Sequence, residues 1–331
     1  MKDGAAIRWL GHTIALPARL VEPAMVALQR LLGIKRLPWV YVAPNLVIVF
    51  SFALLPVLIN VVYSVTGTDN LFASQRPFIG FENFQTLFEC ENFFDPSSCS
   101  RDLFWRAIGN TLWFVPVQVA VMVGIALITA LALNRGIRGR AFFRGVFFFP
   151  VMLSPVVVAL TWQWLLQRNG ALNAIIAWAG FTPVAWMVNA NAAKFWVVFV
   201  TVWAHMGFYT IILLAGLQSI PADVYEAAKM DSASPWRVFT RITLPLLKPV
   251  LLVVLVLCVI RSVQTFDEIY LLTGGGPGSA TLLLVQYIYQ TGFAVQPRNY
   301  GLAAAASLLV GVALLAFTVA QLRLSRGARN G

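Results

Sequence analysis

A row of polar side chains lies inside an otherwise apolar stretch at about 247–271. Its members follow the spacing i, i+3, i+4 and i+7, which places them on one face of a helix: Arg261, Gln264, Thr265 and Glu268. Asp267 lies one residue off this face, and Tyr270 follows it. Charged groups in an apolar helix must face other protein groups or water. Arg261 and Glu268 therefore pair with each other or with a second subunit, or they line a path for a polar solute.

A second apolar stretch, at about 195–217, carries aromatic side chains around a single histidine. Trp203 and Phe208 are candidates for stacking against a sugar ring, although packing is the commoner role of such aromatics. His205 has no second histidine nearby in the sequence, so an interior hydrogen bond is a commoner role for it than metal ligation. The sequence therefore predicts no metal site.

The composition places these polar residues in a membrane. Of the 331 residues, 59% are hydrophobic and only 11% are charged, which excludes an ordinary soluble domain. A spanning helix needs about 20 apolar residues. Six stretches meet this need, at about 40–65, 107–133, 143–166, 195–217, 247–271 and 301–322. Pro150 and Pro155 interrupt the third stretch, which is expected to continue to the outer surface. We expect an all-α membrane protein with six transmembrane helices.

The basic residues predict the orientation of the chain. If the N-terminus lies inside, the inside segments hold most of the 24 Lys and Arg. These inside residues are Lys2, Arg8, Arg19, Arg30, Lys35, Arg36, Arg135, Arg138, Arg140, Arg144, Lys229, Arg237, Arg241, Lys248, Arg323, Arg326 and Arg329. Cytoplasmic tails at 1–38 and 325–331 would then flank a transmembrane domain at 39–324, with the first tail able to lie on the lipid surface. The net charge of +11 reflects this topology, and no nucleic-acid partner is expected.

An outside loop is expected at 66–106, between the first two spans. It contains Cys90 and Cys99, and the third cysteine, Cys258, falls in the fifth span. A bridge between the first two would close a short loop in an oxidising compartment. Two free cysteines are equally compatible with the sequence. The loop could also form part of a docking surface.

A polar, proline-marked segment at 219–249 lies between the fourth and fifth spans. Pro221 and Pro235 suit the first turns of two short helices, and Ser234 can cap the second. Asp223 and Glu226 fall at the start of the first helix, where its positive end favours acids. The small residues that follow Glu226 leave a smooth patch that fits a groove in another protein, although an ordinary connecting loop is the simpler interpretation.

The residue order in this segment resembles the EAA loop of bacterial ABC importer permeases. The resemblance lies in Glu226-Ala227-Ala228, then Ser232, then Ile242-x-Leu244-Pro245. The family usually has glycine at the position of Ser232, so a different backbone conformation is expected in this turn. The resemblance implies that the loop docks on a cytoplasmic ATPase through Glu226, Ala227, Ala228, Asp231 and Ser232. A second signature of the family resembles FDEIYLLTGGGP at 266–277.

Together these motifs resemble the maltose-type, carbohydrate-importing branch, and the resemblance covers the chain from about Trp39 to its end. It implies a MetI-like permease fold in the bacterial cytoplasmic (inner) membrane, and half of a translocation pathway for a sugar, oligosaccharide, polyol or glycerol phosphate. The implied partners are a second permease subunit, two ATPase subunits and an external solute-binding protein. This chain would bind no cofactor and catalyse no reaction, because ATP and Mg would be bound by the ATPase. The pathway candidates are Trp203, Phe208, Arg261, Gln264, Asp267, Glu268 and Tyr270.

Two other classes of membrane protein are alternatives to an ABC permease. A secondary transporter or channel driven by an ion gradient could use Arg261, Asp267 and Glu268 as a relay, and it would need no EAA loop. A membrane enzyme would need a catalytic constellation, and the sequence contains no recognisable one. The glycine-rich run at 274–281 lacks the Lys-Ser/Thr end of a Walker A motif, so it is predicted to be a turn.

Overall fold

The computed structural model describes residues 29, 33, 35, 37–67, 70, 72, 75–135 and 138–327, without side-chain detail at residues 37 and 324–327. Most of the tail expected at 1–38 and the last four residues of the tail expected at 325–331 lie outside this part. The described residues form helices, with two isolated β-bridges and no named strand. The chain divides into two compact units, Met1–Val62 and Tyr63–Gly331.

The first unit contains one long apolar helix. It consists of α2 (Leu37–Val49), the short π-helical segment η1 (Phe50–Leu54) and α3 (Leu55–Ser64), whose last two residues belong to the second unit. The stretch Pro38–Ser64 is long and apolar enough to cross a membrane, and none of the residues in its most apolar window is buried. The structure therefore has a spanning helix at the first predicted position.

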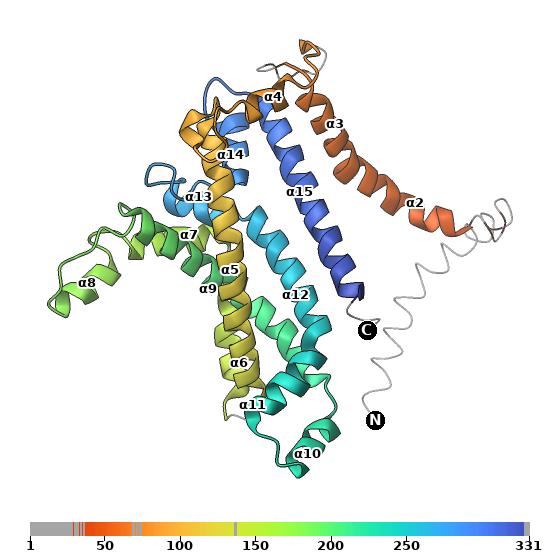
Figure 1. Cartoon of the computed structure of the whole chain (residues 1–331), viewed down its shortest axis with the longest axis vertical. Coiled ribbons are helices and arrows are strands. Elements are labelled where there is room, and N and C mark those ends of the chain that lie inside the picture. Colours follow the sequence, from red (N-terminus) through yellow and green to blue (C-terminus); the bar gives the residue numbers. More distant parts are fainter. Residues whose placement is uncertain are drawn as a thin grey trace, which may run out of the picture. The chain divides into compact units, whose positions relative to one another are not determined.

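The second unit is organised around four long helices, which run side by side in Figure 1. They are α5 (Asp102–Asn134), α9 (Ala190–Gln218), α12 (Leu244–Gln264) and α15 (Tyr300–Gly327). The main core joins α5, α9 and α12 through Phe114, Met122, Leu213 and Val254, which are almost fully buried. Because large apolar side chains fill the space between these helices, they form a stable frame for polar residues at their ends.

The third predicted span is sharply bent. It consists of α6 (Arg140–Phe148), η4 (Phe149–Met152) and α7 (Pro155–Leu165), and its two halves meet at 97°. Pro155 lacks the amide hydrogen that a continuous helix would need, and this explains the break. The interruption predicted at Pro150 and Pro155 is confirmed, whereas the size of the bend was not predicted. Counting the bent pair once, the described residues contain up to six candidate spans, in agreement with the predicted number.

Short elements occupy the two ends of this unit. One end carries α4 (Glu82–Phe88), η3 (Pro96–Ser98), α14 (Leu284–Tyr289) and η6 (Gln290–Ala294), and the opposite end carries α10 (Ala222–Met230), α11 (Pro235–Val238) and η5 (Phe239–Thr243) (Figure 1). Two further short helices are α8 (Ala171–Trp178) and α13 (Asp267–Thr273). The polar segments singled out in the sequence therefore lie at opposite ends of the bundle.

Candidate pathway and coupling site

The polar row of the fifth span does not lie on one continuous helix. α12 ends at Gln264, Thr265 and Phe266 have non-helical backbone, and α13 begins at Asp267. The prediction of a single helix over 247–271 was therefore wrong. The signal for a break was present, because Asp267 and Glu268 are both acidic and fall in the first turn of the new helix, where its positive end favours carboxylates.

Arg261 and Glu268 nevertheless come together across this break, and His205 of α9 joins them. Nη2 of Arg261 lies 3.4 Å from Oε1 of Glu268 and 3.0 Å from Nε2 of His205. Nδ1 of His205 lies 3.0 Å from the carbonyl oxygen of Thr201. Since a carbonyl oxygen only accepts, Nδ1 donates, and Nε2 of the neutral ring accepts from Arg261. We call these three side chains the Arg261 cluster.

The three members of the Arg261 cluster differ in exposure. The Glu268 side chain is 1% exposed, that of His205 is 21% exposed and that of Arg261 is 42% exposed. Removing the carboxylate would leave the guanidinium without its counter-charge in an apolar surrounding. The buried groups therefore hold the guanidinium in place, while part of the Arg261 side chain stays exposed.

The other pathway candidates fall into separate environments. Gln264 and Asp267 are exposed, and the Tyr270 ring stacks on that of Phe266 with 5.1 Å between centroids. Phe208 is exposed and lies one helical turn from His205. Trp203 is two residues from His205, on a different face of α9, and it packs edge-on against Trp162. The structure thus places Trp203 in an aromatic cluster apart from Arg261.

The segment at 219–249, here called the coupling segment, forms the two short helices predicted for it. Pro221 precedes α10, and Pro235 opens α11, whose N-terminus is capped by the Ser234 side chain. Glu226 and Ala227 of α10 are exposed, whereas Ala228 is buried. The motif therefore presents Glu226 and Ala227 at the surface, while Ala228 packs inward. The side chain of Tyr225 anchors α10, because its hydroxyl lies 3.2 Å from that of Thr243.

The turn after α10 retains the conformation that glycine favours. Ser232 has φ 51°, the left-handed region, and it is the one non-glycine residue with positive φ within the described part of the chain. The expectation that serine would change the backbone here was wrong. The amide of Ala233 donates to the carbonyl of Ala228 at 3.0 Å, as in a common helix end. This closure holds Ser232 in a strained conformation.

Two exposed apolar side chains of the coupling segment were missed in the sequence. Met230 is 87% exposed and Trp236 is 73% exposed. The same segment forms a hollow of about 600 Å³, lined by residues of α10 and α11 that include Ala227 and Arg237, although neither Met230 nor Trp236 lines it. A tryptophan in a polar loop, next to a motif of small residues, was the available signal, because such side chains are common binding anchors.

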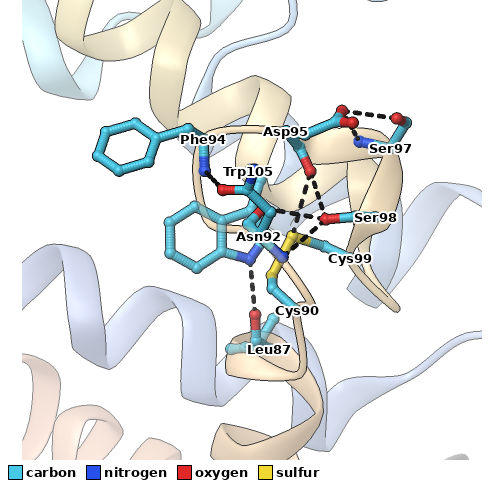
Figure 2. The surroundings of a disulfide bond; sticks show 9 residues. All are labelled: Leu87, Cys90, Asn92, Phe94, Asp95, Ser97, Ser98, Cys99 and Trp105. Carbon is cyan, nitrogen blue, oxygen red and sulfur yellow. Dashed lines mark hydrogen bonds between the residues drawn. A yellow bond between two sulfur atoms is a disulfide. The ribbon is translucent and has the colours of Figure 1, made fainter.

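At the opposite end of the unit, Cys90 and Cys99 are joined by a disulfide, and Figure 2 shows its surroundings. We call residues 87–105 the disulfide segment. Nε1 of Trp105 donates to the carbonyl of Leu87 at 2.9 Å, and the Asp95 carboxylate accepts from the amide and hydroxyl of Ser97 at 3.0 and 2.6 Å. Because Ser97 hydrogen-bonds to the charged form, the pKa of Asp95 lies below its ordinary value. The segment is thus closed largely by its own bonds.

The glycine-rich run after α13 forms a turn attached to α5. Gly274, Gly275 and Gly278 all have positive φ, a conformation that glycine adopts without strain. Nδ2 of Asn110 donates to the carbonyl oxygens of Ser279 and Leu282 at 2.7 and 3.0 Å. Within the described part of the chain, no three His, Cys, Asp or Glu side chains are grouped so that they could hold a metal ion.

Comparison with known proteins identifies the family. Residues 100–330 match the model described as "Binding-protein-dependent transport system inner membrane component". The chain is 36% identical over 299 residues to the trehalose/maltose transport system permease protein MalF of Thermococcus litoralis, covering 89% of this chain and 95% of that protein.

Two solved structures share the fold of this chain. One is a bacterial ABC transporter involved in the import of the acidic polysaccharide alginate, with a TM-score of 0.76 and 26% identity over 91% of this chain and 98% of that one. The other is the alginate transporter in complex with an alginate pentasaccharide-bound periplasmic protein, with a TM-score of 0.75, 25% identity and the same coverage. The chain therefore belongs to the family of inner membrane components of binding-protein-dependent transport systems, as an ABC importer permease of the maltose type.

Proposed function

We propose that this chain forms half of the translocation pathway of an ATP-driven carbohydrate importer and couples to its ATPase through the coupling segment. A second permease subunit would supply the other half of the path, and an external solute-binding protein would deliver the solute. Two ATPase subunits would bind ATP and Mg, and this chain would bind no cofactor and catalyse no reaction. The relatives support this arrangement, since they are named as sugar permeases or solved with a periplasmic protein.

The observation that carries the proposal is the surface of α10 and α11. α10 exposes Met230 as well as Glu226, and α11 exposes Trp236. Large exposed apolar side chains of this kind are common where another protein docks. The hollow lined by α10 and α11 offers a concave site for a partner's side chain. A closing motion of the ATPase would then move α10, and with it the adjoining α9 and α12, and so open the path to one face or the other.

The Arg261 cluster supports a neutral polyhydroxylated solute over an anionic one. Glu268 lies against the Arg261 guanidinium and compensates its charge, while the exposed N–H groups remain available to hydroxyl oxygens. A sugar, oligosaccharide or polyol fits this pattern better than glycerol phosphate. Competition of each solute against labelled uptake in the reconstituted complex distinguishes them, and stronger competition by glycerol phosphate would overturn this assignment.

The topology belongs to the same proposal. Both termini would be cytoplasmic, in the tails at 1–38 and 325–331, and the permease domain would occupy residues 39–324 of the inner membrane. The coupling segment would then be cytoplasmic and the disulfide segment external. This orientation agrees with the basic residues near the coupling segment, which include Arg140, Arg144, Arg237 and Arg241.

The test is the charge reversal Glu226→Lys in the full complex. We expect the variant to insert in the membrane and to lose ATP-dependent uptake, because a lysine would replace the exposed carboxylate in the docked surface. Glu91→Lys, which reverses an exposed carboxylate in the disulfide segment, is the matched control: it should bind the ATPase as the unaltered chain does, whereas Glu226→Lys should not. Normal uptake by Glu226→Lys would contradict the coupling role.

The same reconstituted system distinguishes the importer from a transporter driven by an ion gradient. The Arg261 cluster is a group of buried and partly buried ionisable residues, which is the feature such a relay would need. Uptake that is inhibited by vanadate and insensitive to an uncoupler supports the ATP-driven mechanism. The reverse pattern would support the ion-driven one.

A further inference from the structure

An apolar groove runs between α5 and α9 on the surface of the bundle. Its volume is about 640 Å³. The lining comes from both helices and includes Val121, Ile125, Phe195, Phe199, Val202 and Met206. Several of these side chains, such as Phe195 and Ile125, are exposed. The groove is separate from the Arg261 cluster and from the coupling segment, since none of their residues lines it.

The length of the groove matches one leaflet of a bilayer. On α5 the lining extends from Trp113 to Ile125, and on α9 the polar Asn191 and Lys194 precede an apolar part that extends from Phe195 to Met206. A rise of 1.5 Å per residue gives about 18 Å and about 17 Å for these two stretches. Half of a hydrocarbon core of about 30 Å is about 15 Å. A neighbouring transmembrane helix would need a groove along the whole core, whereas a single acyl chain needs one of this length.

A cation lies at the end of the groove where α9 begins. Nζ of Lys194 is 5.3 Å from the ring centroid of Trp113, and Asn191 lies one turn before it on α9. Lys194 is partly buried, and in the part of the chain that the structure describes it has no acidic side chain within ion-pair distance. Tryptophan and lysine at one end of an apolar helix are typical of the headgroup level of a membrane. This end of the groove therefore lacks an anion.

We propose that the groove is a binding site for one anionic phospholipid of the leaflet on the Lys194 side. One acyl chain lies between α5 and α9, and the phosphate accepts hydrogen bonds from the Lys194 ammonium and the Asn191 amide. The bound chain covers Phe195 and Val121, so the lipid completes the contact between the two helices. The proposal does not depend on the transported solute or on the ATPase.

The test uses a phosphatidylglycerol that carries a photoactivatable diazirine near the end of one acyl chain. The full chain, purified with the subunits that accompany it, is placed in vesicles of equal parts phosphatidylethanolamine and phosphatidylglycerol that contain this probe. After illumination, labelled peptides are mapped. We expect label on α5 and α9 around Val121 and Val202, and about fivefold less of it in Lys194→Gln, which is the affinity that one lysine gains near an anionic headgroup.

Three further variants make the result specific. Lys194→Arg keeps the charge and should keep the label, and Arg168→Gln removes an exposed cation outside the groove and should also keep it. Val121→Trp fills the groove and should lose the label although Lys194 is intact. Equal labelling of Lys194→Gln and the unaltered chain would overturn the proposal. Label spread evenly over all apolar helices would overturn it as well, as would an unlabelled groove, the result expected if another helix covers it.

Discussion

The disulfide segment and the coupling segment are both polar, and they lie at opposite ends of the same bundle, yet they are stabilised in different ways. The disulfide segment closes on itself through the Cys90–Cys99 bond, the Asp95 turn and the hydrogen bond from Trp105 to Leu87. The coupling segment is attached at its base by Tyr225 and leaves the Trp236 side chain 73% exposed. Large apolar side chains that no other part of the chain covers are common where a partner protein binds. The comparison therefore shows that the disulfide segment is closed by its own bonds, although Phe94 stays exposed in it, and it supports the proposal that the coupling segment docks on a partner.

The largest effect is expected from removing the exposed anchor of the coupling segment. Trp236→Ser should weaken binding of the ATPase by about 30-fold, because a buried tryptophan at the centre of an interface commonly contributes 2 kcal/mol or more. Titration of the ATPase into nanodiscs that contain the full chain measures this. Trp178→Ser, at an equally exposed tryptophan of α8, should leave the affinity unchanged. An unchanged affinity in Trp236→Ser would remove the distinction between the segments.

The next largest effect concerns the disulfide. Replacing both Cys90 and Cys99 by serine should lower the local free energy of unfolding by about 2–3 kcal/mol. Without the cross-link, the unfolded segment gains conformational entropy, and this favours its unfolding. Limited proteolysis should then cut the disulfide segment faster, while the affinity for the ATPase stays the same. Loss of ATPase binding in this variant would show that the two segments do not have separate roles.

A smaller and opposite effect is expected at the strained turn of the coupling segment. Ser232→Gly should stabilise the end of α10 by about 0.5–1 kcal/mol, because glycine adopts positive φ without the penalty that serine has. Slower amide hydrogen exchange in α10 would show this. Ser234→Ala is the contrasting variant, since it removes the cap of α11 and should destabilise that helix by about 1 kcal/mol. Faster exchange of α10 in Ser232→Gly would contradict the strain.

The smallest effect is a pH dependence in the disulfide segment. The folded pKa of Asp95 lies below the value of 3.8 that it has in an unfolded chain, because Ser97 hydrogen-bonds to the carboxylate. Its contribution to stability is therefore complete above that value and is lost as the pH falls through the folded pKa. Proteolysis of the segment should accelerate over this acidic range, and Asp95→Asn should reduce the acceleration. The coupling segment should show no such change from Asp95.

The sequence predicted the parts of the fold that depend on local pattern. Apolar length gave the spans, and Pro235 with Ser234 predicted the start of α11. The break between α12 and α13 was missed, because an i, i+3, i+4, i+7 spacing looks the same whether or not the backbone is interrupted. His205 could not be joined to Arg261 from the sequence, because 56 residues separate them and only the packing of α9 against α12 brings them together.

The exposure of the Trp236 side chain could not be predicted from the sequence either. The tryptophan at position 236 is evident in the sequence, but its burial depends on whether another element of the chain covers α11. Among the described residues no element covers it fully. The left-handed turn at Ser232 was missed for a related reason. The bonds that close the end of α10 stabilise that conformation more than serine disfavours it.

Docking of the coupling segment on the ATPase can be tested with a photocrosslinking amino acid at position 236 in the full chain within the membrane. We expect a crosslink from this position to an ATP-binding subunit. The same amino acid at position 94, where the phenylalanine is 98% exposed in the disulfide segment, should give no crosslink to that subunit. Failure of position 236 to capture an ATP-binding subunit, or equal capture from position 94, would contradict the account.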